Sequence, residues 1–278
     1  MTKANSAATM SLDGPAFPRE WRKPPFIQRA SVRWLLWAGA LLYMVFAIGS
    51  LDINWVRVGQ GLERGWVFIQ GFLKPDFFSR GGDIWMGFQE SLTMTVTSTA
   101  AGVLLAIPVA IGAARNLAPA WIYFFCRAII AVSRTLNEII VAILLVAMFG
   151  FGPFAGFLTL TFATIGFMAK LLAEDIEEIA QSQLEALRAT GASMLQLLDF
   201  AVLTQVLPRL IGLSLYRLDI NFRESAVIGI AGAGGIGATL NTAMDRYEYD
   251  SAAAILLIII AIVMLAEYFS GWLRRRIL

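Results

Sequence analysis

Long apolar runs alternate with shorter polar segments along most of this chain. The runs cover approximately residues 34–50, 91–113, 154–172, 202–231 and 252–272, with an interrupted stretch at 119–149. Each run reaches or approaches the roughly 20 residues with which an α-helix crosses a bilayer. The pattern predicts an all-α, polytopic membrane protein with about six transmembrane helices. The alternative, a soluble all-α protein, would have to bury every one of these runs in its core.

The stretch from Pro119 to Phe149 is the least regular of these segments. As one helix it would be roughly 46 Å long, more than one hydrocarbon core but too little for two spans. Four polar residues interrupt it: Ser133, Arg134, Asn137 and Glu138. Residues 120–132 are therefore expected to be interfacial or tilted, and residues 136–149 to lie deeper. One long helix here gives six spans and puts both termini on the same side of the membrane, whereas two spans here would give seven.

Basic residues flank both ends of the chain and set the expected orientation. Arg19, Arg22, Lys23 and Arg29 precede the first span, and residues 274–276 after the last span are all Arg. Because such residues gather on the cytoplasmic side, both termini are expected there. Residues 17–29 either lie along the membrane surface or form only a basic tail. The start lacks the features of a signal peptide, so the first span is expected to be a retained anchor.

This reading divides the chain into three regions. Residues 1–30 form a cytoplasmic tail with a possible interfacial helix, and residues 31–85 hold the first span and an extracytoplasmic loop. Residues 86–278 form the transmembrane core. Within this core, the polar segment at about 173–200 lies on the cytoplasmic side by the span count.

Composition agrees with a membrane protein and narrows its chemistry. The chain is 58% hydrophobic and 15% charged, with a mean hydropathy of +0.69, whereas a soluble domain is nearer half apolar and a quarter charged. It has one cysteine, Cys126, and no histidine, which excludes a Cys/His zinc site, an intrachain disulfide and a Ser-His-Asp triad. No Walker A pattern occurs. These absences weaken most enzyme interpretations, and we expect no catalytic residue, metal or cofactor.

The polar segment before the fifth span has a helix–glycine–helix pattern. Residues 185–189 are good helix formers, and Gly191 permits a sharp turn or a close backbone approach. Pro208 is expected near the start of the next membrane helix, where proline is tolerated. Alone, the pattern also fits an ordinary helical connector.

The run Glu185-Ala186-Leu187-Arg188-Ala189-Thr190-Gly191 resembles the EAA loop of ABC importer permeases. That loop reads E-A-A, three further residues and G. The resemblance implies a coupling helix that docks in a groove on an ATPase subunit. The implied coupling residues are Glu185, Ala186, Leu187, Arg188, Gly191 and Ala192. Leu187 departs from the second alanine of the pattern, and Thr204 stands where the family usually has proline.

Further segments resemble the phosphonate branch of this family. They are residues 150–156, 170–174, 216–225 and 229–237, and the likeness extends over about 88–273. It implies a type I importer permease in a bacterial inner membrane, surrounded by lipid and paired with a second copy. It further implies two ABC ATPase subunits, an extracytoplasmic binding protein and phosphonate as cargo. Phosphate, phosphite or another oxyanion carried by the same mechanism is the alternative. The net charge of +2 gives no reason to expect a nucleic-acid partner.

The glycine-rich run after the fifth span matches G-x-G-x-x-G, the dinucleotide-binding fingerprint. That interpretation needs a strand before the run and a helix after it, and no strand pattern precedes it here. The glycines are instead expected to end the fifth span and to allow close packing near the outer gate. They are Gly232, Gly234, Gly235 and Gly237.

Ionisable residues inside the predicted spans permit two interpretations. Such groups are costly at membrane depth, so they pair with one another or face a cavity. They can form internal ion pairs, such as Arg134 with Glu138 four residues later. They can instead line an oxyanion pathway, because guanidinium groups offer forked donors to its oxygens. The candidate pathway residues are Arg134, Asn137, Asn221, Arg223 and Ser225.

Two other classes of membrane protein compete with an ATP-driven permease. An ion-coupled secondary transporter predicts inverted repeats around broken helices, and the chain has no convincing internal repeat. A membrane enzyme needs a cluster of catalytic groups, for which the absence of histidine leaves few candidates.

Overall fold

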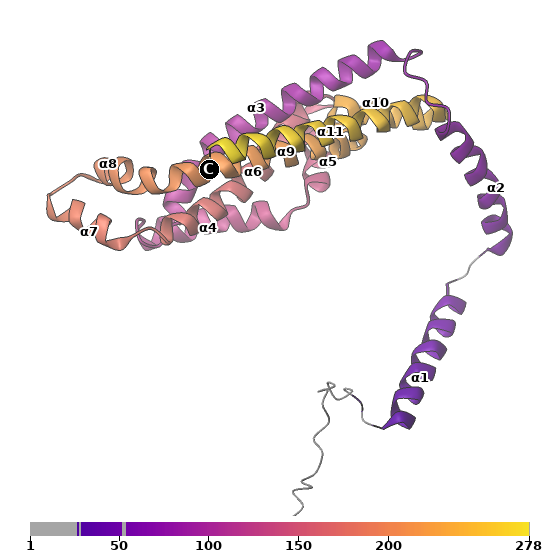
Figure 1. The fold of residues 1–278 in the computed structure, drawn as a ribbon, viewed down its shortest axis with the longest axis horizontal. Helices are drawn as coiled ribbons and strands as arrows, with labels where there is room; N and C mark the ends of the chain where they lie inside the picture. The colour runs from indigo at the N-terminus through magenta and orange to yellow at the C-terminus, as the bar shows by residue number, and fades with distance from the viewer. Residues whose placement is uncertain (1–26, 28, 52–53, 278) are drawn as a thin grey trace, which may run out of the picture. The chain divides into compact units, whose positions relative to one another are not determined.

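The structure is a computed structural model that describes residues 27, 29–51 and 54–277, in which every regular element is a helix (Figure 1). The α-helices are α1 (Ala30–Gly49), α2 (Trp55–Phe72), α3 (Gly81–Ala113), α4 (Ala120–Thr135), α5 (Glu138–Phe149), α6 (Pro153–Glu177), α7 (Gln181–Ala189), α8 (Met194–Leu197), α9 (Thr204–Ile228), α10 (Gly235–Asp245) and α11 (Tyr249–Ile277). Two π-helical segments, η1 (Leu198–Leu203) and η2 (Gly229–Ala233), adjoin α9. The all-α prediction is confirmed for this part of the chain. Most of the predicted tail, residues 1–26 and 28, lies outside the described residues.

Five helical runs in the described residues are long and apolar enough to cross a membrane. They are Ala30–Gly49, Gly81–Ala113, Pro153–Glu177, Met194–Ala233 and Tyr249–Trp272. The number becomes six if α4 and α5 together count as one broken span. These runs correspond to the five uninterrupted apolar segments of the sequence, and the prediction of about six spans is confirmed at this level.

The prediction of one long helix over residues 119–149 is wrong. The axes of α4 and α5 are bent by 95° relative to each other. The first helix ends at Thr135, and the Oδ1 atom of Asn137 accepts a hydrogen bond of 2.9 Å from the backbone N–H of Ile139. Asparagine is a favoured N-cap because its side chain satisfies an amide that the first helical turn leaves without a partner. The polar residues in the apolar stretch therefore start a new helix.

The chain divides into two compact units between Leu62 and Glu63. In the first unit, α1 has no buried residue, and its large apolar side chains are exposed. The second helix begins in this unit and occupies part of the predicted extracytoplasmic loop. Its apolar residues Leu62, Trp66 and Ile69 recur at helical spacing, which favours an amphipathic helix over an irregular loop.

In the second unit, α3 and α6 share the most extensive helix–helix interface among the described residues. Their close approach depends on small residues. A Cβ atom on Gly102 of α3 would lie 2.5 Å from the Cβ of Thr164 on α6. Likewise, a Cβ atom on Gly166 of α6 would lie 2.5 Å from the Cβ of Ser133 on α4. Small residues commonly allow membrane helices to pack at short distance.

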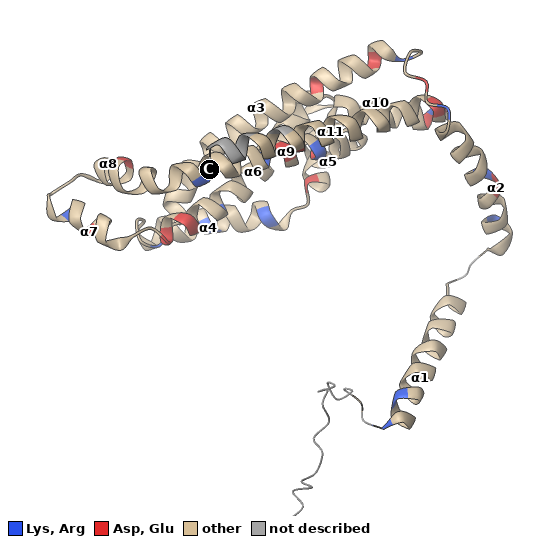
Figure 2. Ribbon diagram, viewed as in Figure 1, with Lys and Arg blue, Asp and Glu red and all other residues tan. Residues whose placement is uncertain are grey.

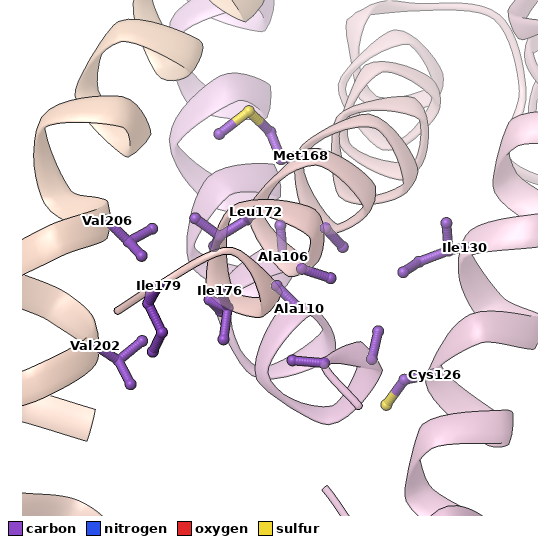
Figure 3. Close-up of a cluster of buried hydrophobic side chains, with 14 of the residues drawn as sticks. Ala106, Ala110, Cys126, Ile130, Met168, Leu172, Ile176, Ile179, Val202 and Val206 are labelled. Carbon is purple, nitrogen blue, oxygen red and sulfur yellow. The ribbon is translucent and has the colours of Figure 1, made fainter. Parts of the chain in front are cut away.

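Apolar side chains at one end of the second unit join α3, α4, α6 and the start of α9 (Figure 3). Leu172 and Ile176 come from α6, Ala110 from α3, and Val202 and Val206 from the η1–α9 run. We call this group the lower cluster. It continues to Leu184 of α7, which is fully buried.

The segment between α2 and α3 is held by polar contacts at the other end of the unit. Hydrogen bonds from the Ser79 side chain and from the backbone N–H groups of Phe78 and Ser79 lower the pKa of the Asp76 carboxyl. Beside it, Arg80 pairs with Glu248, with 2.6 Å between Nε and Oε2. This ion pair joins the start of α3 to the α10–α11 turn.

Substituting Gly102 tests the packing of α3 against α6. We expect Gly102→Val to lower the stability of the purified protein by about 1–3 kcal/mol, because the added atoms overpack the interface with Thr164. The matched control is Gly82→Val near the start of α3, where nothing lies within 4 Å of an added Cβ. The measurement is thermal unfolding in detergent, and equal midpoints for the two variants would contradict this description.

Candidate functional site

The predicted coupling segment forms a helix, a glycine turn and a second helix. The α7 helix ends before Thr190, and Gly191 follows with a φ of +78°. Residues other than glycine adopt this left-handed conformation with difficulty. Ser193 then begins α8 with a capping box, in which its N–H donates to Oε1 of Gln196 at 2.8 Å. The local structure expected from the sequence is confirmed.

One side of α7 packs against the lower cluster, and the other side is exposed. Leu184 is fully buried and Leu187, one turn later, is half-buried, and both pack on the lower cluster. Glu185, Ala186 and Arg188 are exposed. The second alanine of the pattern is thus replaced by a leucine that contributes to anchoring. Figure 1 shows α7 and α8 projecting from the end of the second unit that lies away from α10.

A second candidate region lies at the bend between α4 and α5. A cavity of about 220 Å³ opens there, and we call it the bend cavity. Its lining residues are Ser133, Arg134, Thr135, Leu136, Asn137, Glu138, Ala163, Phe167 and Arg217. Of the five predicted pathway residues, the structure brings Arg134 and Asn137 to this cavity. Figure 2 shows a small group of charged residues where α9 runs beside α5, between the charges at the two ends of the unit.

Two other predicted pathway residues are buried in helix packing. Asn221 is fully buried, and its Nδ2 atom donates to the hydroxyl oxygens of Thr99 at 2.8 Å and Thr164 at 2.9 Å. Ser225, also fully buried, donates to the carbonyl oxygen of Phe222 at 2.7 Å. The Asn221 contacts join α9 to α3 and α6, whereas the Ser225 contact lies within α9. A pathway role for these two residues stays a prediction.

The fifth predicted residue, Arg223, lies on the outer face of α9. Its guanidinium is 3.1 Å from a carboxylate oxygen of Asp219, one turn earlier, and its side chain is 57% exposed. It does not line the bend cavity. A pathway role for Arg223 stays a prediction, as it does for Arg134 and Asn137.

Arg217 is a prominent residue that the sequence interpretation missed. Its side chain is only 4% exposed and lies 3.1 Å from Oε2 of Glu224. Its Nε atom donates to the hydroxyl oxygen of Thr164 at 3.2 Å. Helical periodicity could have revealed it, because residues 217, 221 and 224 share one face of a helix, whereas 219 and 223 lie on another.

The glycine-rich run forms a tight turn between α9 and α10. Gly232, Gly234 and Gly235 have φ angles of +94°, +78° and +73°, which are open to glycine at little cost. A Cβ atom on Gly237 would clash with the carbonyl oxygen of Ala226. These are close-packing contacts, and a gate role stays a prediction. The run follows a helix, and the described residues contain no strand that a dinucleotide-binding unit would need.

Two residues of α3 fix the start of α10. Oε2 of Glu90 accepts a hydrogen bond of 2.9 Å from the N–H of Gly235. The hydroxyl oxygen of Ser91 accepts another of 2.9 Å from the N–H of Ile236. The amides of a first helical turn have no partner within their helix, so these contacts cap α10 from a neighbouring span. The sequence interpretation assigned no role to Glu90.

Comparison with known proteins shows which family this chain resembles. Residues 102–278 match the family model described as "Binding-protein-dependent transport system inner membrane component". The phosphate-import permease protein PhnE of Mycolicibacterium smegmatis is 40% identical over 218 residues, which are 76% of this chain. The match covers only 41% of that relative's length.

Other relatives match more of their own length. The phosphite transport system permease protein PtxC of Stutzerimonas stutzeri is 37% identical over 239 residues, 85% of this chain and 86% of the relative. A cryptic phosphonate transport system permease protein of Escherichia coli is 42% identical over 118 residues, 42% of this chain and 97% of the relative.

Among solved structures, a subunit of the MetNI methionine ABC transporter in an inward-facing conformation has a similar fold. The TM-score is 0.60 at 24% identity, and the match covers 71% of this chain and 98% of that subunit. The expectation of a type I ABC importer permease fold is confirmed.

The cap on α10 can be tested at Glu90. We expect Glu90→Met to lower stability by about 1–3 kcal/mol, because the N–H of Gly235 loses its acceptor in a half-buried position. Glu90→Gln keeps a carbonyl oxygen at the same place, so its stability should be closer to that of the wild type. Thermal unfolding of both variants in detergent is the measurement. A Gln variant as unstable as the Met variant would show that the acceptor is not what matters.

Proposed function

This chain belongs to the family of binding-protein-dependent transport system inner membrane components, and we propose that it forms the translocation pathway of an ATP-driven importer of phosphonates. The observation that carries this proposal is the 37% identity over 239 residues to a phosphite permease of nearly the same extent. The likeness of residues 150–156 and 229–237 to phosphonate permeases adds support. The named relatives concern phosphate, phosphite and phosphonate, which are all tetrahedral phosphorus oxyanions.

The proposed assembly contains two copies of this chain, two ABC ATPase subunits and an extracytoplasmic binding protein. The exposed face of α7, with Glu185 and Arg188, is the proposed contact with the ATPase. A short helix set in a groove of a partner transmits a rigid-body movement without carrying chemistry itself. Anchoring of α7 through Leu184 supports this role, because an element that transmits force has to be joined to the spans.

We place the coupling segment and both termini on the cytoplasmic side of the membrane. With α7 there, the α9–α10 turn at Gly232–Gly237 faces the outer end of the pathway, where a gate would lie. The basic residues at the end of the chain, Arg274 to Arg276, agree with this orientation.

The outer face of α9 is the proposed wall of the pathway between the two copies. Arg209, Tyr216 and Arg223 are exposed and follow one another at intervals of seven residues, so they share one face of the helix. Arginine side chains in contact with hydrocarbon are costly. A water-filled route between two copies removes that cost.

Transport can be measured in proteoliposomes that contain this chain, its ATPase and its binding protein. We expect uptake of labelled 2-aminoethylphosphonate that requires ATP and both partners. Uptake without the ATPase would contradict an ATP-driven mechanism. ATP-dependent uptake of labelled phosphite or phosphate, with none of the phosphonate, would keep the mechanism and replace the cargo.

Gly191 offers a test of the coupling segment. No atom lies within 4 Å of a Cβ added there, but the φ of +78° strains other residues. We expect Gly191→Val to reduce ATP-driven uptake about tenfold, because a strain of roughly 1–2 kcal/mol distorts the turn after α7. Gly191→Asn is the matched control, since asparagine tolerates this conformation better. Equal uptake by the two variants would remove Gly191 from the coupling role.

A further inference from the structure

We propose that the bend cavity is a transit site for the tetrahedral oxyanion of the cargo, held by the guanidinium groups of Arg134 and Arg217. This inference rests on the proposed function for the class of cargo. It assigns a role to Arg217, and it locates substrate recognition at the break between α4 and α5 rather than along the outer face of α9.

The two guanidinium groups converge on one aromatic ring. The Cζ atom of Arg134 lies 5.7 Å from the centre of the Phe167 ring, and that of Arg217 lies 5.4 Å from the same centre. Both side chains line the bend cavity with Phe167. The face of an aromatic ring attracts guanidinium cations. It therefore keeps two cationic donors beside the same space.

Both arginines retain hydrogen-bonding capacity for a ligand. A guanidinium carries five N–H donors, and the described contacts of Arg217 use Nε for Thr164 and Nη2 for Glu224. Within the described residues, Arg134 forms no ion pair. Arginine donors match the oxygens of a phosphorus oxyanion in geometry as well as in charge.

The α5 helix adds a positive end to the same cavity. Asn137, its N-cap, and Glu138, its first residue, both belong to the lining. The N-terminus of a helix of this length favours an anion through its backbone dipoles. Because the chain bends by 95° at this point, this helix end borders the cavity instead of continuing α4.

Size and charge suit brief occupation rather than tight binding. A volume of about 220 Å³ equals roughly seven water molecules at about 30 Å³ each, which is enough for a small oxyanion with some of its water. Glu138 lines the cavity and Glu224 neutralises Arg217. These carboxylates weaken the attraction for an anion, and an ion in transit has to leave again.

A purely structural role explains Arg217 but not Arg134. The contacts of Arg217 with Glu224 and Thr164 tie α9 to α6, so its loss would also disturb packing. Arg134 is exposed at the cavity, and its substitution should leave the fold intact. Arg134 is therefore the decisive position, with Arg217→Lys as the mild change at the buried position.

The test uses the complete transporter in proteoliposomes, with labelled 2-aminoethylphosphonate uptake and ATP hydrolysis measured on the same vesicles. We expect Arg134→Gln to reduce uptake about tenfold, the effect of losing one charge-assisted contact, while ATP hydrolysis stimulated by the loaded binding protein stays within about twofold of the wild type. Uptake by the Arg134→Lys and Arg217→Lys variants should lie between that of Arg134→Gln and that of the wild type. The matched control is Arg127→Gln on the same helix, because Arg127 pairs with Glu177 outside the cavity.

Occupation of the cavity is measured directly with the Thr135→Cys variant in a Cys126→Ala background. We expect millimolar 2-aminoethylphosphonate to slow labelling of this cysteine by a thiol reagent, and the effect to disappear when Arg134→Gln is added. Unchanged uptake in the Arg134→Gln variant, or labelling that the phosphonate does not slow, would overturn the transit site. In either case ATP-dependent uptake by the wild type would leave the proposed function standing, whereas no uptake of any phosphorus oxyanion by the wild type would overturn the proposed function.

Discussion

A buried hydrogen-bond network around Thr164 determines how the central helices of this protein fit together. Asn221 of α9 donates to Thr164 of α6 and Thr99 of α3, and Arg217 donates to the same Thr164 hydroxyl. Asn221, Thr164 and Arg217 are buried between the helices, so their polar atoms take partners from neighbouring helices. The network sets which face of α9 points inward. The opposite face, with Arg209 and Arg223, therefore lies outside the single chain and needs a polar environment.

The same constraint explains where the helices are interrupted. A break inside the membrane exposes backbone groups, and at two breaks in the described part of the chain side chains satisfy some of them. Asn137 caps the start of α5, and Glu90 and Ser91 cap the start of α10 from α3. The start of α10 is buried against α3, whereas the start of α5 borders the bend cavity, where it can contribute to a site as well as to the fold.

The sequence predicted the helical class, the approximate spans and the local form of the coupling segment, because each depends on composition and pattern over a short range. The prediction of one long helix failed at residues 119–149, because hydropathy and length do not determine the direction that the chain takes after Asn137. The sequence interpretation also treated Asn221 and Arg223 alike, although only one points into the bundle. Periodicity places these two residues on different faces, but which face points inward depends on Thr99 and Thr164, which lie 122 and 57 residues away from Asn221. Partners at such separations cannot be read from local periodicity.

Helix α6 links the two candidate sites physically. The C-terminal half of α6 contributes Met168, Leu172 and Ile176 to the lower cluster, on which Leu184 anchors α7. One turn before this cluster, Thr164 and Phe167 contact Arg217. If α6 moves as a rigid element, a displacement of α7 by the proposed ATPase partner would shift Thr164 and Phe167 against α9. Such a movement would change the space between Arg134 and Arg217, and this connects an event at the coupling segment to the release of an anion from the bend cavity.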